Sequence, residues 1–357
     1  MNVKRGLLIF VFLSFLVGGS LLFASVNSAS FEIFKRAESA RLALAFFLVV
    51  TVWLLDALKL KLLARAGGEI ISFGFSIQLT LINYFGAAVT PMQSGGGPFQ
   101  MFMMYRRGIS LGKSMAITLV RTALTLFILG LTIPFTVMLN ASDLPDTGWG
   151  LRGFLFYVLT FVMTLWFLVV LSLVRPHLIK RLVGMAVMLL KRLGFLKSGR
   201  VNTVIRRINS EIDAYNQNVR DFITRGRSHF LLGMAVGVVQ IWAYLSIMPC
   251  MIWALDIPVV YVECVLVQAL FLFLLYFIPT PGGSGAAEGG AAMIFTLFVP
   301  WNVAGVLGVG WRFLTEYTGI VLGVCVAVKE LGWDVAKMMS AKPSHGPNDD
   351  GDGNISP

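Results

Sequence analysis

The stretch that most constrains the fold is a short run of prolines and small residues between two long apolar runs. It reads Thr-Pro-Gly-Gly-Ser-Gly from Thr280 to Gly285, and the apolar runs 261–278 and 291–299 flank it. Pro lacks a backbone donor and Gly opens left-handed backbone angles, so this stretch cannot continue a helix smoothly. Its flanks are too apolar for a surface loop of a soluble protein. Broken backbone at membrane depth is tolerated only where protein or a water-filled cavity satisfies its polar groups.

Composition agrees with a membrane setting. Of the 357 residues, 57% are hydrophobic and 13% are charged, whereas ordinary globular chains have about 45–50% apolar residues. Several apolar runs reach the roughly 20 residues that a helix needs to cross a bilayer. We therefore predict an all-α, polytopic helical membrane protein.

The net charge of +11 could suggest a nucleic-acid partner, but its distribution argues against one. Lys and Arg gather between the apolar runs, as the positive-inside rule requires, and no basic patch is interleaved with aromatic residues. We expect contact with anionic lipid headgroups at the inner membrane surface and no nucleic-acid partner.

The broken stretch has a second copy upstream. It reads Thr-Pro-Met-Gln-Ser-Gly from Thr90 to Gly95, and its offset from the later copy is 190 residues. Arg121 and Arg312 follow the two copies at an offset of 191 residues. This order predicts an internal duplication in which two broken-helix elements face each other.

The distribution of basic residues gives the two elements opposite orientations. No Lys or Arg lies between Arg65 and Arg106, which flank the first element, so its hairpin is expected to enter from the cytoplasm. No Lys or Arg lies between Arg227 and Arg312, so the second hairpin is expected to enter from outside. The prediction is an inverted repeat with about six full spans and two re-entrant broken-helix hairpins, whose substrate site lies near the midplane.

The predicted organisation has a first membrane repeat at 1–140, a second at 141–329 and a disordered tail at 342–357. Both termini are expected in the cytoplasm of a cell (inner) membrane. The first apolar run could be read as a signal peptide, but it is longer than the roughly 7–15 residues of a signal core. A retained span is therefore favoured. The predicted full spans are 6–26, 42–63, 114–139, 151–174, 230–255 and 302–328.

The second repeat contains a basic cytoplasmic segment, 175–229, with twelve Lys or Arg against three acids. Its apolar residues recur every three or four positions, as on one face of a helix. A helix lying on the inner membrane surface is favoured, and a coiled-coil contact with an envelope-enzyme partner or a second copy is the alternative. The stripe consists of Val201, Ile205, Ile208, Ile212, Tyr215, Val219 and Phe222.

The connection 27–41 is expected outside, although it contains three basic residues against two acids and so fits the charge rule poorly. Near the inner end of the second span, Asp56 is expected to pair with Lys59 one turn on. A structural, snorkelling role is the default interpretation for these two side chains.

Four ionisable residues inside predicted spans are candidates for function: Arg121, Glu288, Arg312 and Glu316. Two guanidiniums beside two helix N-termini would form an anion site, because Arg grips phosphate bidentately and helix starts present free N–H groups. Glu288 could balance that charge, carry a proton or select a cationic headgroup. For Arg312 and Glu316, four residues apart, an internal ion pair that fixes helix packing is the alternative.

The remaining predicted substrate-binding residues lie in and beside the two broken stretches, where the glycines could equally serve only the turn and close helix packing. They are Thr90, Pro91, Ser94, Gly95, Gln100, Thr280, Pro281, Gly282, Gly283, Ser284 and Gly285. No catalytic triad, metal-ligand spacing or Walker pattern occurs in the sequence, so we predict no catalytic residues, metal or cofactor.

These motifs resemble a known family. The residues around Thr90-Pro91 and Ser94-Gly95, followed by Arg121, are similar to its first signature, and Pro279 to Gly285 with Glu288 and Arg312 are similar to its second. This is the flippase-like family named after the transmembrane region of lysylphosphatidylglycerol synthase. In many members an acidic residue follows the first glycines; here 98–100 read Pro-Phe-Gln. The resemblance implies a polytopic protein that handles lipids or lipid-linked amphiphiles.

The leading hypothesis is a non-enzymatic translocator of an anionic phospholipid or lipid-linked amphiphile. One alternative is a membrane-embedded transferase that modifies lipid headgroups, for which only Glu288 or Glu316 could serve as base or nucleophile. Another is a non-transporting accessory subunit of a cell-envelope lipid enzyme. The chain could also form a homo-oligomer.

Overall fold

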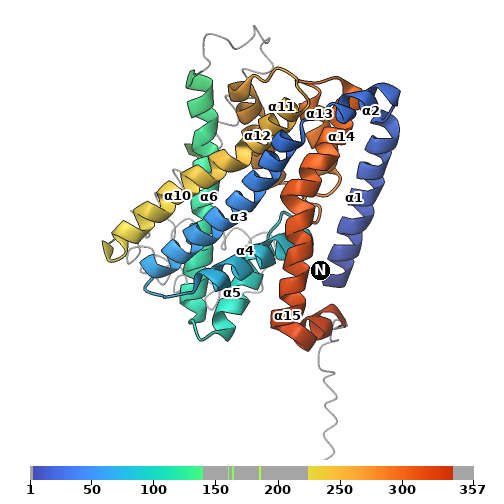
Figure 1. Ribbon diagram of the computed structural model, residues 1–357. Coiled ribbons are helices and arrows are strands. Elements are labelled where there is room, and N and C mark those ends of the chain that lie inside the picture. Colours follow the sequence, from blue (N-terminus) through green and yellow to red (C-terminus); the bar gives the residue numbers. More distant parts are fainter. Residues whose placement is uncertain (1–2, 140–159, 161–162, 165–184, 186–223, 341–357) are drawn as a thin grey trace, which may run out of the picture.

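The computed structural model describes residues 3–139, 160, 163–164, 185 and 224–340. Helices make up most of these residues, as the composition predicts (Figure 1). They are α1 Val3–Ser25, α2 Ser28–Lys35, α3 Ser39–Ala66, α4 Phe73–Ala88, α5 Gly96–Arg106, α6 Leu111–Leu139, α10 Arg227–Leu245, α11 Ile247–Ala254, α12 Tyr261–Leu275, α13 Ala286–Phe295, α14 Trp301–Arg312, the π-helical turn η2 Phe313–Tyr317 and α15 Thr318–Ser340.

Five helical stretches in this part of the chain are long and apolar enough to cross a bilayer, which confirms a polytopic helical membrane protein. They are Arg5–Ser25, Ser39–Ala66, Leu111–Thr136, Arg227–Ala254 and Trp301–Glu330. Most of the predicted span 151–174, most of the basic segment 175–229 and the tail 342–357 lie outside the described residues. The inverted repeat, its boundaries and the re-entrant hairpins stay predictions.

Helices α3 and α10 pack side by side through the middle of the bundle (Figure 1). The pair α4–α5 lies toward the end where the N-terminus is, and α12–α13 lies toward the other end (Figure 1). Each pair also packs against the long helix of the other half of the chain, α4 against α15 and α12 against α6. The two broken stretches are thus held by helices distant from them in sequence.

Close packing of α4 against α15 depends on glycine. A Cβ added at Gly323 would lie 2.3 Å from the carbonyl oxygen of Leu81, so no larger residue fits without moving a helix. Helix α1 packs against α13 and α14 at the edge of the bundle, so the first apolar run is part of the folded bundle. Phe10 of α1 is buried there.

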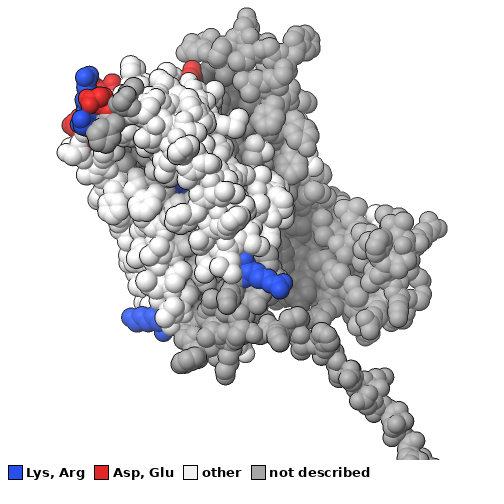
Figure 2. All heavy atoms as spheres, turned by 90° about the vertical axis from the view of Figure 1, so that its right-hand side faces the viewer, with Lys and Arg blue, Asp and Glu red and all other residues white. Residues whose placement is uncertain are grey.

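The outer face agrees with a membrane environment. On the part of the face shown in Figure 2 that is not grey, most charged side chains lie toward the two ends, and a broad zone with almost no visible charge separates them. Large apolar side chains such as Phe15 and Phe23 are 79% and 92% exposed on α1. Lipid chains would cover such residues in a bilayer.

The connection 27–41 forms a short helix, α2, which hydrophobic periodicity did not predict. Its basic residues are largely neutralised locally. Lys35 lies 3.0 Å from Glu32, and Arg41 pairs with Glu38 and, at 3.2 Å, with Asp256. Two of the three basic residues in this connection therefore have acidic partners, although the positive-inside rule counts Lys and Arg rather than net charge.

Candidate functional site

The two broken stretches contain the same kind of turn, although they differ at its end, where φ is −79° at Gly95 and 83° at Gly285. In each, a Pro is followed by two residues with positive φ and a Ser whose N–H donates to the Pro carbonyl, at 3.2 Å for Ser94 and 3.0 Å for Ser284. Positive φ at both central positions is the mark of a type I′ turn. The central residues have φ of 54° and 53° at Met92 and Gln93, and of 59° and 68° at Gly282 and Gly283.

The two turns also touch. Pro91 and Pro281 form an antiparallel backbone bridge. The Gly282 N–H lies 3.1 Å from the Ala87 carbonyl oxygen and 3.3 Å from that of Thr90. A break in a helix leaves backbone N–H and C=O groups without helical partners, which is costly in an apolar environment. Here the backbone around the first turn accepts a hydrogen bond from the second turn, so each break satisfies part of the other.

A buried charge cluster lies among α3, α4, α6 and α10. It joins Arg121 of α6 to Asp56 of α3, and the other oxygen of Asp56 lies 2.9 Å from Nζ of Lys59. Lys59 also donates to Oε1 of Gln240 at 2.8 Å, and Arg121 Nη1 donates to Asn83 Oδ1 at 3.4 Å. The cluster has two positive groups and one negative group. We call it the first cluster.

The predicted pairing of Asp56 with Lys59 is thus present, but the snorkelling role is wrong. The Lys59 side chain is 1% exposed and turns inward toward α6 and α10. Asp56, Thr125 and Gln240 offset the cost of burying its ammonium group, because they accept the three hydrogen bonds that the group can donate. The sequence analysis did not identify Asp56 as the partner of Arg121. The signal was present, because an ionisable residue in an apolar span is expected to pair with another polar group.

A second cluster surrounds Arg312 at the end of α14. Nη2 donates to the Gly282 carbonyl oxygen at 2.5 Å, Nε lies 3.6 Å from Glu288, and Nη1 lies 3.7 Å from Glu316. Glu288 also accepts hydrogen bonds from Ser14 of α1 at 2.9 Å, from Tyr317 at 2.5 Å and from the Gly285 N–H at 2.6 Å. One positive group faces two carboxylates in this second cluster.

Tyr84 of α4 lies between the two clusters. Its ring packs on Trp53 of α3, with 6.4 Å between the ring centroids, and it lies against Gly319, two residues after Tyr317. Tyr84 is partly exposed. Buried charge, the two touching turns and a partly exposed tyrosine therefore lie close together.

The other predicted residues have mainly local contacts. The Thr90 hydroxyl accepts from the Gly95 N–H at 2.6 Å, and Thr280 donates to the Ser284 carbonyl oxygen at 3.0 Å. Gln100 ties α5 to α4 through a 2.8 Å bond to the Leu79 carbonyl oxygen. Ser94 is exposed and bonds the Pro91 carbonyl, whereas the buried Ser284 hydroxyl has no hydrogen-bond partner among the described residues.

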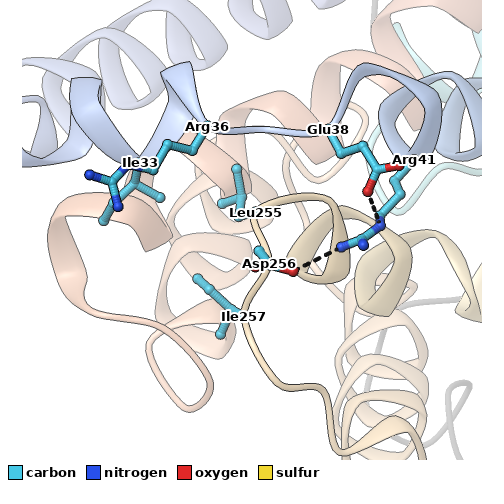
Figure 3. A pocket seen from close by; sticks show the side chains of 7 residues that line it. All are labelled: Ile33, Arg36, Glu38, Arg41, Leu255, Asp256 and Ile257. Carbon is cyan, nitrogen blue, oxygen red and sulfur yellow. Dashed lines mark hydrogen bonds and ion pairs between the residues drawn. The ribbon is translucent and has the colours of Figure 1, made fainter.

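A surface pocket of about 560 Å³ lies apart from these residues, where α2 and the start of α3 meet the α11–α12 connection. Figure 3 shows the Arg41 guanidinium reaching Glu38 on one side and Asp256 on the other. The pocket contains none of the predicted site residues. It is lined by Ile33, Arg36, Glu38, Arg41, Leu255, Asp256 and Ile257.

Residues 5–323 match the family described as the lysylphosphatidylglycerol synthase TM region. The chain belongs to this family. The match covers both turns, both arginines and both charge clusters, which confirms the resemblance found in the motifs. The chain is also 26% identical over 297 residues to a UPF0104 membrane protein of Archaeoglobus fulgidus, a region that covers 83% of this chain and 88% of that relative.

Proposed function

We propose that this protein translocates an anionic phospholipid or lipid-linked amphiphile across the cell (inner) membrane, with both termini in the cytoplasm. One observation carries the proposal: the two turns meet at Pro91 and Pro281, and two buried arginines lie near them. Arg312 bonds the Gly282 carbonyl of the second turn, and Arg121 bonds Asn83, whose side chain lies against Gly96 just after the first turn. Moving a phosphate headgroup through a bilayer is opposed by the high cost of an unpaired charge in hydrocarbon. Buried guanidiniums along the path would lower that cost.

Arg121 keeps a donor for such a headgroup, because its buried Nε has no hydrogen-bond partner among the described residues. Nε of Arg312 also makes no hydrogen bond there, but it lies 3.6 Å from Glu288 as part of an ion pair. Asp56 holds another nitrogen of Arg121, and the Gly282 carbonyl holds Nη2 of Arg312. The proposed headgroup phosphate would accept from Nε of Arg121 and would compete with Glu288 for Nε of Arg312.

The proposal assigns no chemistry on the lipid to this chain. Glu288, a candidate base in a transferase, is buried and already accepts three hydrogen bonds and faces Arg312. A carboxylate with its lone pairs so occupied is poorly placed to take a proton from a substrate. A membrane lipid is the expected substrate, and a homo-oligomer or an envelope-enzyme partner remains part of the proposal.

The test is lipid movement in proteoliposomes that contain fluorescently labelled phosphatidylglycerol. Wild type should expose the label from the inner leaflet to a membrane-impermeant quencher, and Arg312→Gln and Arg121→Gln should each slow this by about tenfold or more. Arg36→Gln, which removes an exposed arginine of the surface pocket, is the matched control and should keep the wild-type rate.

Unfolding curves of each variant in detergent separate a lost site from a lost fold. Equal rates in folded Arg312→Gln and wild type would remove the arginine from the mechanism. No movement in wild type would reject translocation and favour the accessory-subunit interpretation. A change in lipid mass after incubation would instead favour the transferase.

A further inference from the structure

The helix that ends in Arg312 continues as a π-helical turn, η2, before α15 begins. The wider turn brings two consecutive side chains onto the second cluster: Glu316 lies near Arg312, and Tyr317 bonds Glu288. Single π turns inside α-helices occur frequently at functional sites. This one gives the second cluster an additional carboxylate.

Glu316 differs from the other two carboxylates of the clusters. Asp56 is bound by Arg121, Lys59 and Thr80, and Glu288 accepts three hydrogen bonds. No residue that the structure describes donates a hydrogen bond to Glu316, whose nearest charged partner is Arg312 Nη1 at 3.7 Å. Its side chain is 22% exposed, against 0% for Glu288. Glu316 is therefore the carboxylate most open to protonation.

The formal charges of the two clusters sum to zero when all groups are ionised. Asp56, Lys59 and Arg121 sum to +1, whereas Glu288, Arg312 and Glu316 sum to −1. A monoanionic headgroup that enters this centre alone would leave one uncompensated charge in a low-dielectric interior, which is costly. A proton that enters with it and binds Glu316 would keep the sum at zero. It would also release Arg312 from one of its two carboxylates.

We propose that Glu316 is a proton-binding site and that one proton enters the centre with each monoanionic lipid headgroup. This inference rests on the proposed function for its substrate. It makes the protein an electroneutral proton–lipid symporter, in which the proton binds a Glu316 carboxylate oxygen and leaves when the headgroup leaves.

The groups that face Glu316 are consistent with this role. Arg312 of α14 is its ion-pair partner at 3.7 Å, and Glu288 of α13 is the second carboxylate beside that arginine. Two tyrosine rings lie on the same stretch of helix. Tyr244 of α10 packs on Trp311, with 6.2 Å between the ring centroids, and a Cβ at Gly319 would lie 3.0 Å from the Tyr84 ring. Tyrosine hydroxyls can donate and accept hydrogen bonds, so in this proposal these two would pass a proton toward the rest of the centre.

The first experiment needs no transport. Dioctanoyl phosphatidylglycerol is added to purified protein in a weakly buffered detergent solution with a pH indicator. Wild type should take up about one proton per chain as the lipid saturates, Glu316→Gln should take up none, and Glu316→Asp, which restores the acid, should recover uptake. Lipid binding without proton uptake in wild type would overturn the proposal.

The second experiment uses the proteoliposome assay with imposed gradients. In wild type each unit of pH difference should shift the equilibrium distribution of the lipid between leaflets by about tenfold, and a potassium–valinomycin potential should have no effect. Glu316→Gln fixes the empty centre at +1, so its transport should lose the pH dependence and become sensitive to the potential.

The two experiments separate the two claims. Wild-type transport that follows the potential and ignores the pH difference would overturn coupling while leaving translocation intact. Proton uptake on lipid binding without any lipid movement would support the proton site and reject translocation. Glu316→Gln that still follows the pH difference would place the proton on another group and overturn the assignment.

Discussion

The two turns have one backbone conformation but opposite surroundings. In the first, Met92 and Gln93 hold positive φ, and Met92 is 48% exposed. In the second, Gly282 and Gly283 hold the same conformation but are buried. A Cβ at Gly282 would lie 2.9 Å from the Phe10 ring of α1. A left-handed turn tolerates side chains where its surface is open, and it needs glycine where another helix covers it.

The two charge clusters also differ in how closely their carboxylates are held. The first cluster has a surplus of positive charge, and its single carboxylate is engaged by three donors, so it is closed. The second has a surplus of carboxylate, and one of its acids is loosely held. The comparison indicates that the first cluster mainly fixes structure and charge, whereas the second can change its protonation. Substitutions in the two clusters and the two turns test this difference.

The largest effect is expected for Asp56→Asn. It leaves Lys59 and Arg121 buried without a counter-charge, and breaking a buried ion pair in this way costs about 3–5 kcal/mol. The free energy of unfolding, measured by denaturant titration in detergent micelles, should fall by that amount. Asp256→Asn, at an exposed carboxylate, is the control.

A double variant sharpens this prediction. Asp56→Asn combined with Lys59→Met removes one charge of each sign and should recover part of the lost stability, because a hydrophobic residue of similar length can replace a buried ion. If Asp56→Asn unfolds like wild type, the first cluster is not a closed structural unit.

A smaller loss in the free energy of unfolding, about 1–3 kcal/mol, is expected for Glu288→Gln. Glutamine can still accept from Ser14 and Tyr317, and Arg312 keeps Glu316 as a partner. The same denaturant titration checks this. A loss as large as that of Asp56→Asn would show that the second cluster is as tightly closed as the first.

The next largest loss of stability is expected for glycine substitutions in the second turn. Gly283→Ala places a side chain at φ of 68° with no close contact, so it should cost about 1–2 kcal/mol through backbone conformation alone. Gly282→Ala has the same backbone cost and also meets Phe10, so its loss should be larger. Thermal unfolding of the pair measures the difference. Equal losses would mean that the Phe10 ring of α1 moves aside for the added methyl group.

The smallest effect, about 1 kcal/mol or less, is expected for Met92→Gly in the open turn. Glycine removes the left-handed strain of Met92 but adds freedom to the unfolded chain, and the two terms nearly cancel. Thermal unfolding should show a slight gain or no change. A clear loss would reveal that the Met92 side chain makes a contact that matters for stability.

Much of the fold could be predicted because the relevant signals are local. Apolar runs of bilayer length predict α1, α3, α6 and the long C-terminal helix, since each residue of such a run is driven by its own transfer from water. The breaks at Thr90 and Thr280 could also be predicted, because Pro, Gly and Ser alter the backbone conformation at their own positions.

The partners of the buried charges could not be predicted in this way. Asp56 meets Arg121 across 65 residues, and Ser14 meets Glu288 across 274. Hydropathy shows that such groups must be satisfied, but many polar residues could satisfy them. The choice depends on which helix faces lie opposite each other, and packing of the whole bundle sets that. Local chemistry therefore specifies the helices, their breaks and the two arginines, while long-range packing specifies that one charge cluster is closed and the other is open.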